Sequence, residues 1–198
     1  MELSDKEFRA MNHPLRRMIQ RRYELPIMRK LGLEPAGRDI LEIGCGSGYG
    51  AQLLAQPAPL SYTGIDLMPE QIALARQRGL VNCTFLQGDV ADLSAFPDGS
   101  FDLVVDFGIL HHVPAWRKTL AECKRVLRQD GLLLVEEPDG AFLSRFDRIF
   151  HWGHPEEAAF SESVFEDELV ARRFAIEKSR RAFGFFWVSA RKDANARA

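Results

Sequence analysis

The stretch Asp39-Ile-Leu-Glu-Ile-Gly-Cys-Gly-Ser-Gly-Tyr-Gly50 decides the fold of this chain. An apolar run over Ile40 to Ile43 ends in four glycines at alternate positions, and an alanine-rich apolar segment begins at Ala51. This order predicts a strand, a sharp turn and a helix. Glycines accept positive φ and let backbone N–H groups approach a ligand closely, and the first turn of a helix adds free donors and a positive dipole end. The stretch therefore predicts the first half of a nucleotide site.

The bulk composition excludes several classes of protein. The chain has 198 residues, enough for one domain with a sizeable core. Its 26 Lys and Arg against 28 Asp and Glu lack the basic excess typical of duplex-binding proteins, so nucleic acid is an unlikely partner. Neither a signal peptide nor an 18-residue apolar run is present. The three cysteines are far apart and form no CxxC motif, which predicts reduced thiols and a cytoplasmic protein.

The first 37 residues are predicted to be helical. A capping box at Ser4 to Glu7 opens a short helix, Pro14 begins a second, and Pro26 begins a third that ends at Gly32. Because these helices precede the first strand, they must pack on the sheet or cover its ligand edge. Their arginines, including Arg16, are interpreted as a solvated face; the alternative is a phosphate-binding face.

After residue 38, apolar strands and helices alternate. Strands are predicted at 40–43, 60–65, 83–87, 101–107 and 132–136, and helices at 51–55, 69–78 and 116–128. Such alternation indicates a parallel sheet with helices on both faces. Helices at 142–150 and 162–173 follow, and then strands at 174–180 and 183–190, joined only by Arg181 and Ala182. A link this short predicts an antiparallel last strand. We expect one main domain over 38–192 and a frayed end over 193–198.

Acidic residues at the strand ends indicate the kind of nucleotide. Ligands of parallel α/β sheets bind at the carboxyl ends of the strands, where Glu42, Asp66 and Asp89 are expected. Asp66 is placed to accept the hydroxyls of a ribose and Asp89 the amino group of an adenine. Glu42 would repel a pyrophosphate and attract an ammonium group. A GxGxxG motif counted from Gly44 fails, because Tyr49 stands at the position of its third glycine. Counted from Gly46, the stretch fits only the variant GxGxxA, and two extra residues then separate the strand from the motif. Adenosine linked to an amino acid fits better than a dinucleotide, and an NAD(P)-dependent oxidoreductase remains the alternative.

Five signatures in order carry a resemblance to a known family. Glu42 to Gly48, Gly64-Ile-Asp66, Gly88-Asp89, Phe101 to Val105 and Arg125 to Gly131 together resemble the class I S-adenosylmethionine-dependent methyltransferases. The nearest branch is that of ubiquinone/menaquinone C-methyltransferase-like enzymes with small-molecule acceptors, and the resemblance covers about residues 38 to 137. It implies an α/β, doubly wound, mostly parallel seven-stranded Rossmann-like sheet with an antiparallel last strand. The N-terminal helices match the region that often forms a lid in this family.

The resemblance also implies residues that bind the cofactor, S-adenosyl-L-methionine. Glu42 would reach its ammonium group, Asp66 would hold the ribose, and Phe107 would lie beside the methionine. The remaining implied contacts are the turn Gly44, Cys45 and Gly46 under the methionyl group, Leu67 and Met68 flanking the adenine, and Asp89 with Val90 at the adenine edge. A protein that binds this cofactor without turnover is a further alternative.

Methyl transfer needs mainly proximity and alignment, because the cofactor already activates the methyl group. A base is needed only where the acceptor loses a proton, and the candidates are His111, His112 and Glu137, of which the histidines have a purely structural alternative. Glu136 or Glu137 is expected to face the site and the other to be solvated or capping. His151 and His154 have no convincing third ligand, so no metal is predicted.

The acceptor itself is only weakly indicated. An apolar acceptor pocket or a core-facing helix would explain Phe142, Phe146, Phe150 and Trp152 equally well. The fourth strand ends without the Asn/Asp-Pro-Pro-Tyr/Phe motif of enzymes that methylate planar nitrogens. This absence argues against base or glutamine N-methylation.

Overall fold

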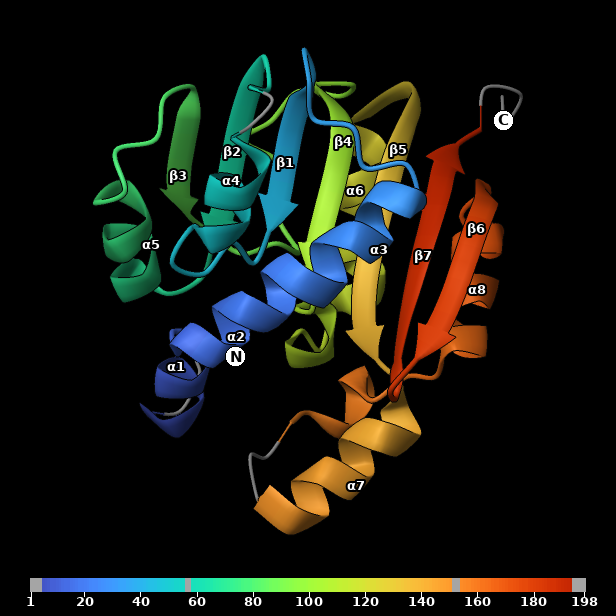
Figure 1. Cartoon of the computed structure of the whole chain (residues 1–198). Helices are drawn as coiled ribbons and strands as arrows, with labels where there is room; N and C mark the ends of the chain where they lie inside the picture. Colours follow the sequence, from blue (N-terminus) through green and yellow to red (C-terminus); the bar gives the residue numbers. More distant parts are fainter. Residues whose placement is uncertain (1–4, 56–57, 151–153, 194–198) are drawn as a thin grey trace.

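A single mixed sheet organises the molecule (Figure 1). The computed structural model describes residues 5–55, 58–150 and 154–193. The strand order is β3-β2-β1-β4-β5-β7-β6; β1 to β5 run parallel, and β7 pairs antiparallel with both β5 and β6. The strands are β1 (Asp39–Ile43), β2 (Ser61–Asp66), β3 (Cys83–Gln87), β4 (Phe101–Phe107), β5 (Leu127–Pro138), β6 (Phe174–Ala182) and β7 (Phe185–Lys192). The predicted doubly wound sheet and its antiparallel last strand are confirmed.

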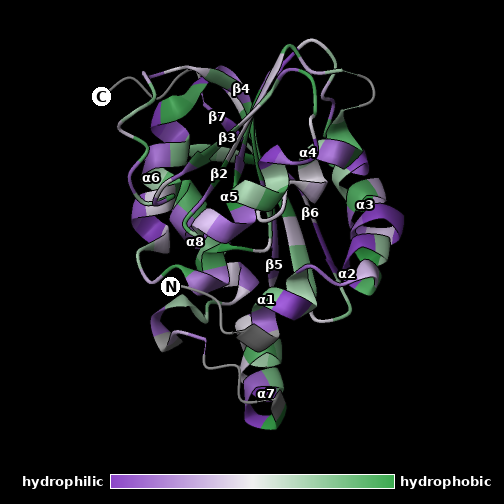
Figure 2. Cartoon of the chain, turned by 90° about the vertical axis from the view of Figure 1, so that its left-hand side faces the viewer, coloured by the Kyte–Doolittle hydropathy of each residue, from purple (hydrophilic) through white to green (hydrophobic). Residues whose placement is uncertain are grey.

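Helices cover both faces of the sheet and create two apolar cores. One face carries α3 (Leu25–Lys30), α4 (Tyr49–Leu54) and α5 (Pro69–Arg76), and their buried side chains pack with Ile40 and Leu103. The other face carries α6 (Trp116–Val126) and α8 (Glu162–Ala171), which pack with Leu41 and Val104. Neighbouring strand residues thus point to opposite cores, as the pleat requires. Figure 2 shows the hydrophilic residues of these helices on their outer sides.

The N-terminal segment forms two helical pieces instead of the three that were expected. After α1 (Asp5–Met11), the chain is helical from Pro14 to Lys30 through α2 (Pro14–Ile19), the π-helical turn η1 (Gln20–Glu24) and α3. The predicted helix near Pro26 is present as α3, which has this proline in its first turn, but it continues from α2 through η1 without a break. Proline removes one donor and crowds the preceding turn, and here that turn is widened, with the N–H of Leu25 donating to the carbonyl of Gln20. The apolar side chains of α3 then enter the core.

The turn between the last two strands also differs from its predicted position. Arg181 and Ala182 belong to β6, and the turn residues are Phe183 and Gly184, with φ of 54° and 81°. A two-residue hairpin of this kind needs positive φ at both central positions, and a glycine meets that demand best. The expected frayed end at 193–198 lies outside the described residues beyond Asp193.

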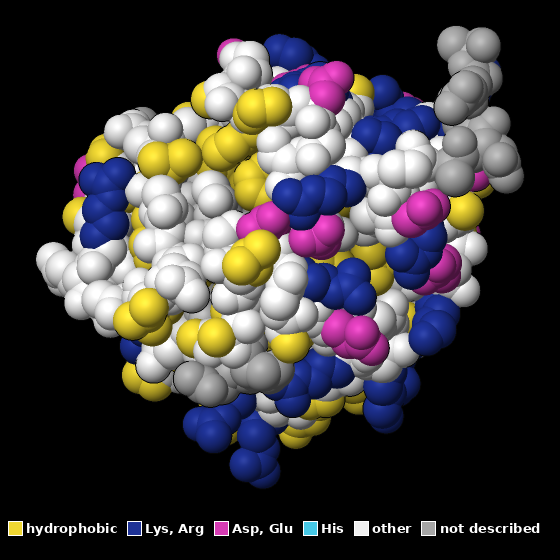
Figure 3. Space-filling model, turned by 90° about the horizontal axis from the view of Figure 1, so that it is seen from above, with side chains coloured by type: hydrophobic (Ala, Val, Ile, Leu, Met, Phe, Trp, Pro, Cys, Tyr) yellow, Lys and Arg dark blue, Asp and Glu magenta, His cyan; other side chains and the backbone are white. Residues whose placement is uncertain are grey.

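The carboxyl ends of the parallel strands form one crowded edge of the molecule. There lie α1, α2, the short turn η2 (Leu110–His112) and α7 (Gly140–Phe150), which extends beyond the sheet in both side views (Figures 1 and 2). The opposite end, seen from above in Figure 3, carries intermixed basic and acidic side chains, and Arg128 pairs there with Asp39 and Asp102 at 2.7 Å each. No helix within the described ranges is both long and apolar enough to cross a membrane.

Candidate active site

The glycine turn after β1 has the conformation that its sequence predicts. Gly44, Gly46 and Gly48 have φ of 66°, 49° and 73°, a region that side chains disfavour. A Cβ on Gly44 would lie 2.4 Å from the side chain of Ile109, so this position also needs glycine for space. Cys45 between them is buried, and burial raises the pKa of its thiol, which fits a filling role and opposes a nucleophilic one.

Glu42 extends from β1 into the space beneath this turn. Its carboxyl group is buried and accepts a 2.5 Å hydrogen bond from the hydroxyl of Tyr62. Burial raises the pKa of Glu42 to about 8, so the group is mostly protonated near neutral pH. A Cβ on Gly50 would stand 2.1 Å from Oε1 of Glu42. Gly50 therefore leaves room for the carboxyl group, a role that only the packing of α4 against β1 reveals.

Asp66 ties the end of β2 to the same turn. Its Oδ2 accepts the N–H of Gly46 at 2.8 Å and its Oδ1 accepts the N–H of Met68 at 2.9 Å. Asp66, Glu42 and the turn line a small pocket of about 90 Å³. The N-terminal helices close its other side with Met11, Asn12, Arg16 and Gln20. The structure thus brings the carboxyl groups of Glu42 and Asp66 and the backbone of the glycine turn around one pocket.

The residues that the resemblance assigns to adenine lie beyond this pocket. Leu67, Met68, Asp89 and Val90 are not among its lining residues. Asp89 is exposed, and its Oδ1 accepts the N–H of Ala91 at 2.8 Å. These four residues follow the carboxyl ends of β2 and β3, and the side chain of Val90 is buried in the core.

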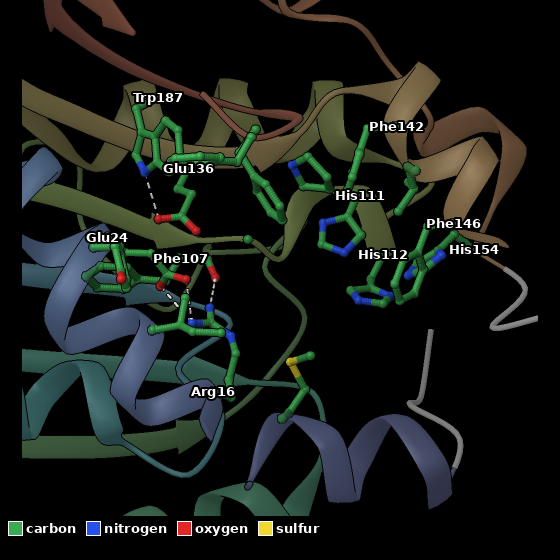
Figure 4. A pocket seen from close by; sticks show the side chains of 18 residues that line it. Arg16, Glu24, Phe107, His111, His112, Glu136, Phe142, Phe146, His154 and Trp187 are labelled. Carbon is green, nitrogen blue, oxygen red and sulfur yellow. Dashed lines mark hydrogen bonds and ion pairs between the residues drawn. The ribbon is translucent and has the colours of Figure 1, made fainter. Parts of the chain in front are cut away.

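A larger pocket of about 510 Å³ adjoins the small one (Figure 4). The two share Met11, Arg16, Phe107, Gly108 and His112 in their linings. The larger pocket is mostly apolar, and its aromatic wall consists of Tyr23, Phe107, Phe142, Phe146, Phe183, Phe185 and Trp187. Phe142 and Phe146 thus line a cavity, while the side chain of Phe150 and all of Trp152 lie outside the described residues.

Arg16 is a site residue that the sequence did not reveal. Its Nη1 lies 2.6 Å and 2.7 Å from the two carboxylate oxygens of Glu24, and its Nη2 donates to the carbonyl of Phe107 at 3.4 Å. Figure 4 shows these contacts on the wall that the two pockets share. The expectation of a solvated side chain is wrong because the unbroken helix turns this face toward the strand ends.

Glu136 and Glu137 are both buried, so neither is solvated. Glu136 faces the large pocket and accepts a 2.7 Å hydrogen bond from the indole of Trp187. Burial and the neighbouring Glu24 raise the pKa of Glu136 well above its usual value. Glu137 instead caps η2, with Oε1 accepting the N–H of Leu110 at 2.6 Å and Oε2 accepting the N–H of His111 at 3.2 Å.

His111 and His112 form the polar end of the large pocket. Oε2 of Glu137 lies 2.7 Å from Nδ1 of His111, which leaves Nε2 of that ring for other contacts. Burial lowers the pKa of His111 to about 3 and that of His112 to about 2, so both imidazoles are neutral at physiological pH. His154 completes the group, with its ring 5.2 Å and 4.8 Å from theirs between centroids. His151 lies outside the described residues.

Comparison with known proteins finds methyltransferases that resemble the central part of this chain. Residues 41–135 match the family described as "Methyltransferase domain". A probable S-adenosylmethionine-dependent methyltransferase of Mycolicibacterium smegmatis is 39% identical over 119 residues, which are 60% of this chain and 45% of that protein. A fatty-acid O-methyltransferase of the same organism is 42% identical over 103 residues, 51% of this chain and 37% of that protein. The chain spans less than half the length of these two relatives.

A solved structure shows the same fold over nearly the whole chain. The crystal structure of a SAM-dependent methyltransferase from Aquifex aeolicus superposes with a TM-score of 0.77 at 20% identity, covering 96% of this chain and 99% of that one. Fold and sequence together define a Rossmann-like methyltransferase domain. Residues 41–135 match the methyltransferase-domain family, and S-adenosylmethionine is the cofactor named for the relative and the solved structure that this chain resembles. Its relation to the quinone C-methyltransferase branch stays a prediction.

Proposed function

We propose that this chain transfers the methyl group of S-adenosylmethionine to an apolar small molecule. The observation that carries the proposal is the aromatic pocket of about 510 Å³, which meets the small pocket beneath the glycine turn at Phe107, Gly108 and His112. An acceptor held there would be aligned with the methyl group and kept from water, the two contributions that this reaction needs most. The name of the fatty-acid O-methyltransferase relative supports a lipid-like acceptor.

We assign the cofactor contacts as the resemblance implies them. Glu42 pairs with the ammonium group, the turn from Gly44 to Gly46 carries the methionyl group, and Asp66 holds the ribose. The adenine lies beyond the ends of β2 and β3, where it is surrounded by Leu67, Met68, Asp89 and Val90. The first 37 residues act as the lid, which their contribution of Met11 and Arg16 to both pockets supports.

The imidazoles would contact the reacting atom of the acceptor. His111, oriented by Glu137, and His112 are the candidates to accept a proton where the acceptor carries one. Glu137 acts through His111 and is a positioning residue. We also place the protein in the cytoplasm, which its three thiols, none of them in a disulfide, support.

The cofactor and the acceptor are tested separately. Calorimetry with S-adenosylhomocysteine should give binding that Asp66→Ala weakens strongly; absence of heat with the wild-type chain would refute the cofactor assignment. Incubation with methyl-labelled cofactor and free fatty acids should then place label in the organic phase. Phe146→Asp should abolish that transfer and retain S-adenosylhomocysteine binding, because it puts a charge in the acceptor pocket. Val170→Asp, at an exposed position on α8, is the matched control and should transfer label normally.

A further inference from the structure

Three histidines distant in sequence meet on the wall of the large pocket. His111 and His112 lie in η2, and His154 follows α7 some forty residues later. One ring nitrogen from each lies within 4.8 Å of the others. The rings of His111 and His112 are 4.1 Å apart between centroids, and Figure 4 shows all three gathered at one end of the cavity.

Carboxylate oxygens contact the Nδ1 atoms of two of these rings. Oε2 of Glu137 lies 2.7 Å from Nδ1 of His111, and Oδ1 of Asp147 lies 2.6 Å from Nδ1 of His154. A carboxylate on Nδ1 fixes the tautomer whose lone pair is on Nε2. The same second contact is found behind most metal-binding histidines, where it orients the ring and makes it more basic. Packing of aromatic rings alone would not require such a partner on two separate elements.

A carboxylate oxygen lies close to the three histidines and is the candidate for a fourth ligand. Oε1 of Glu7, on α1, lies 4.0 Å from Nε2 of His154, and both side chains are buried. The three histidines also line the large pocket, from which an acceptor oxygen would approach.

We propose that His111, His112 and His154 form a binding site for a divalent transition metal of the zinc type. Imidazole nitrogens suit Zn²⁺ and its neighbours in the first row. Zinc–nitrogen bonds of about 2.0 to 2.1 Å in a tetrahedron place the nitrogens about 3.4 Å apart. The widest separation, 4.8 Å, would therefore shorten by about 1.4 Å when the ion binds. Glu7 or an acceptor oxygen would take the fourth position.

This inference goes beyond the proposed function and is an alternative to the proton-accepting role of His111 and His112, because an imidazole nitrogen that binds the ion cannot also accept a proton. Because His112 lines both pockets, the ion would lie beside the point where acceptor and methyl group meet. It would hold an acceptor oxygen there, and it would join α1 to the segment after α7 across the mouth of the site.

The experiment measures metal binding by the full chain directly. The protein is dialysed against a chelator and titrated calorimetrically with Zn²⁺, and Co²⁺ is added separately to record its visible absorption. One ion per chain is expected, with His154→Ala and His154→Gln weakening Zn²⁺ binding at least 100-fold. His13→Ala is the matched control, because His13 is exposed and lies outside the group, and it should bind Zn²⁺ like the wild type.

The same proteins are tested for S-adenosylhomocysteine binding, which reports their folding. Wild-type protein that binds S-adenosylhomocysteine but no Zn²⁺ would overturn the metal site and leave the proposed function intact. Folded His154 variants with wild-type Zn²⁺ affinity would overturn it as well. If both His154 variants fail to fold, Asp147→Asn replaces them: a 10- to 100-fold loss of Zn²⁺ affinity supports the site, and an unchanged affinity refutes it.

Discussion

Glu42 stands in surroundings that disfavour its charge. It is buried, it accepts a hydrogen bond from the hydroxyl of Tyr62, and the nearby Asp66 and Asp106 repel a negative charge. Its raised pKa has a direct consequence for the proposed cofactor contact, because an ammonium group pairs with the carboxylate and not with the neutral acid. The proton must leave when the cofactor binds.

The affinity for S-adenosylhomocysteine should therefore rise with pH. With a pKa of about 8, only the ionised fraction of Glu42 is competent, so affinity falls about tenfold for each pH unit below 8 and levels off above it. Calorimetry at pH 6, 7 and 8.5 measures this dependence. Glu42→Gln should flatten it; a wild-type affinity that does not change with pH would contradict the assignment.

Single residues differ in how far sequence alone could place them. Glu42 and Asp66 were predictable, because a strand end followed by glycines leaves few places for an acidic side chain. Arg16 was not predictable as a site residue. Its side chain contacts Glu24, 8 residues later, and the carbonyl of Phe107, 91 residues later. The signal in the sequence was the spacing of 8 residues between Arg16 and Glu24, because an unbroken helix brings residues at this spacing to the same side.

Among the elements, α4 and β1 are coupled through the space that Gly50 leaves. Gly50→Ala would improve the helix propensity of α4 but would drive a methyl group against the carboxyl group of Glu42. Overpacking of this kind costs about 1 to 3 kcal/mol. We expect the free energy of unfolding in urea to fall by that amount.

The same substitution in a variant without the Glu42 carboxyl group tests this explanation. In Glu42→Ala, the additional change Gly50→Ala should cost nothing or stabilise the protein, because the space is then available. Equal losses in both backgrounds would show that Gly50 serves backbone conformation and not the carboxyl group.

Element order was accessible from the sequence, and two boundaries were not. Alternating apolar strands and helices predicted the sheet, because burial on both faces makes central strands uniformly apolar. The helix at Pro26 was predicted, but its unbroken connection to α2 through a π-helical turn was not. The predicted hairpin turn lies two residues too early in the sequence. Its position depends on the register of β7 against β5 and of β6 against β7.

At the scale of the molecule, buried acids gather at the carboxyl edge of the sheet. Burial raises the pKa of Glu137 to about 7, and it raises the pKa values of Glu24, Asp106 and Glu136 in the same direction as that of Glu42. The folded chain therefore holds more protons than the unfolded chain between pH 4.5 and these raised values. His111 and His112 act oppositely, but only below their unfolded pKa of about 6.5.

Above pH 6.5 the buried acids should dominate the pH dependence of stability. The free energy of unfolding should fall as pH rises from 6.5 to 8.5, by about 2 kcal/mol from Glu42 alone. Urea unfolding at pH 6.5, 7.5 and 8.5 measures this change. Glu42→Gln should reduce the slope and leave the part due to the other acids; stability that increases over this range would contradict the buried-acid interpretation.

The sequence by itself determined the sheet, the glycine turn and the acidic residues of the cofactor end, because strand periodicity, positive φ and strand-end chemistry are local properties. The tertiary structure alone decided the acceptor side. It brought Arg16 against the end of β4, joined the aromatic residues of α7 and β7 around one cavity, and placed His154 beside His111 and His112. Those contacts span tens of residues, and their positions depend on how α2 and α7 pack on the strand ends, which no local pattern encodes.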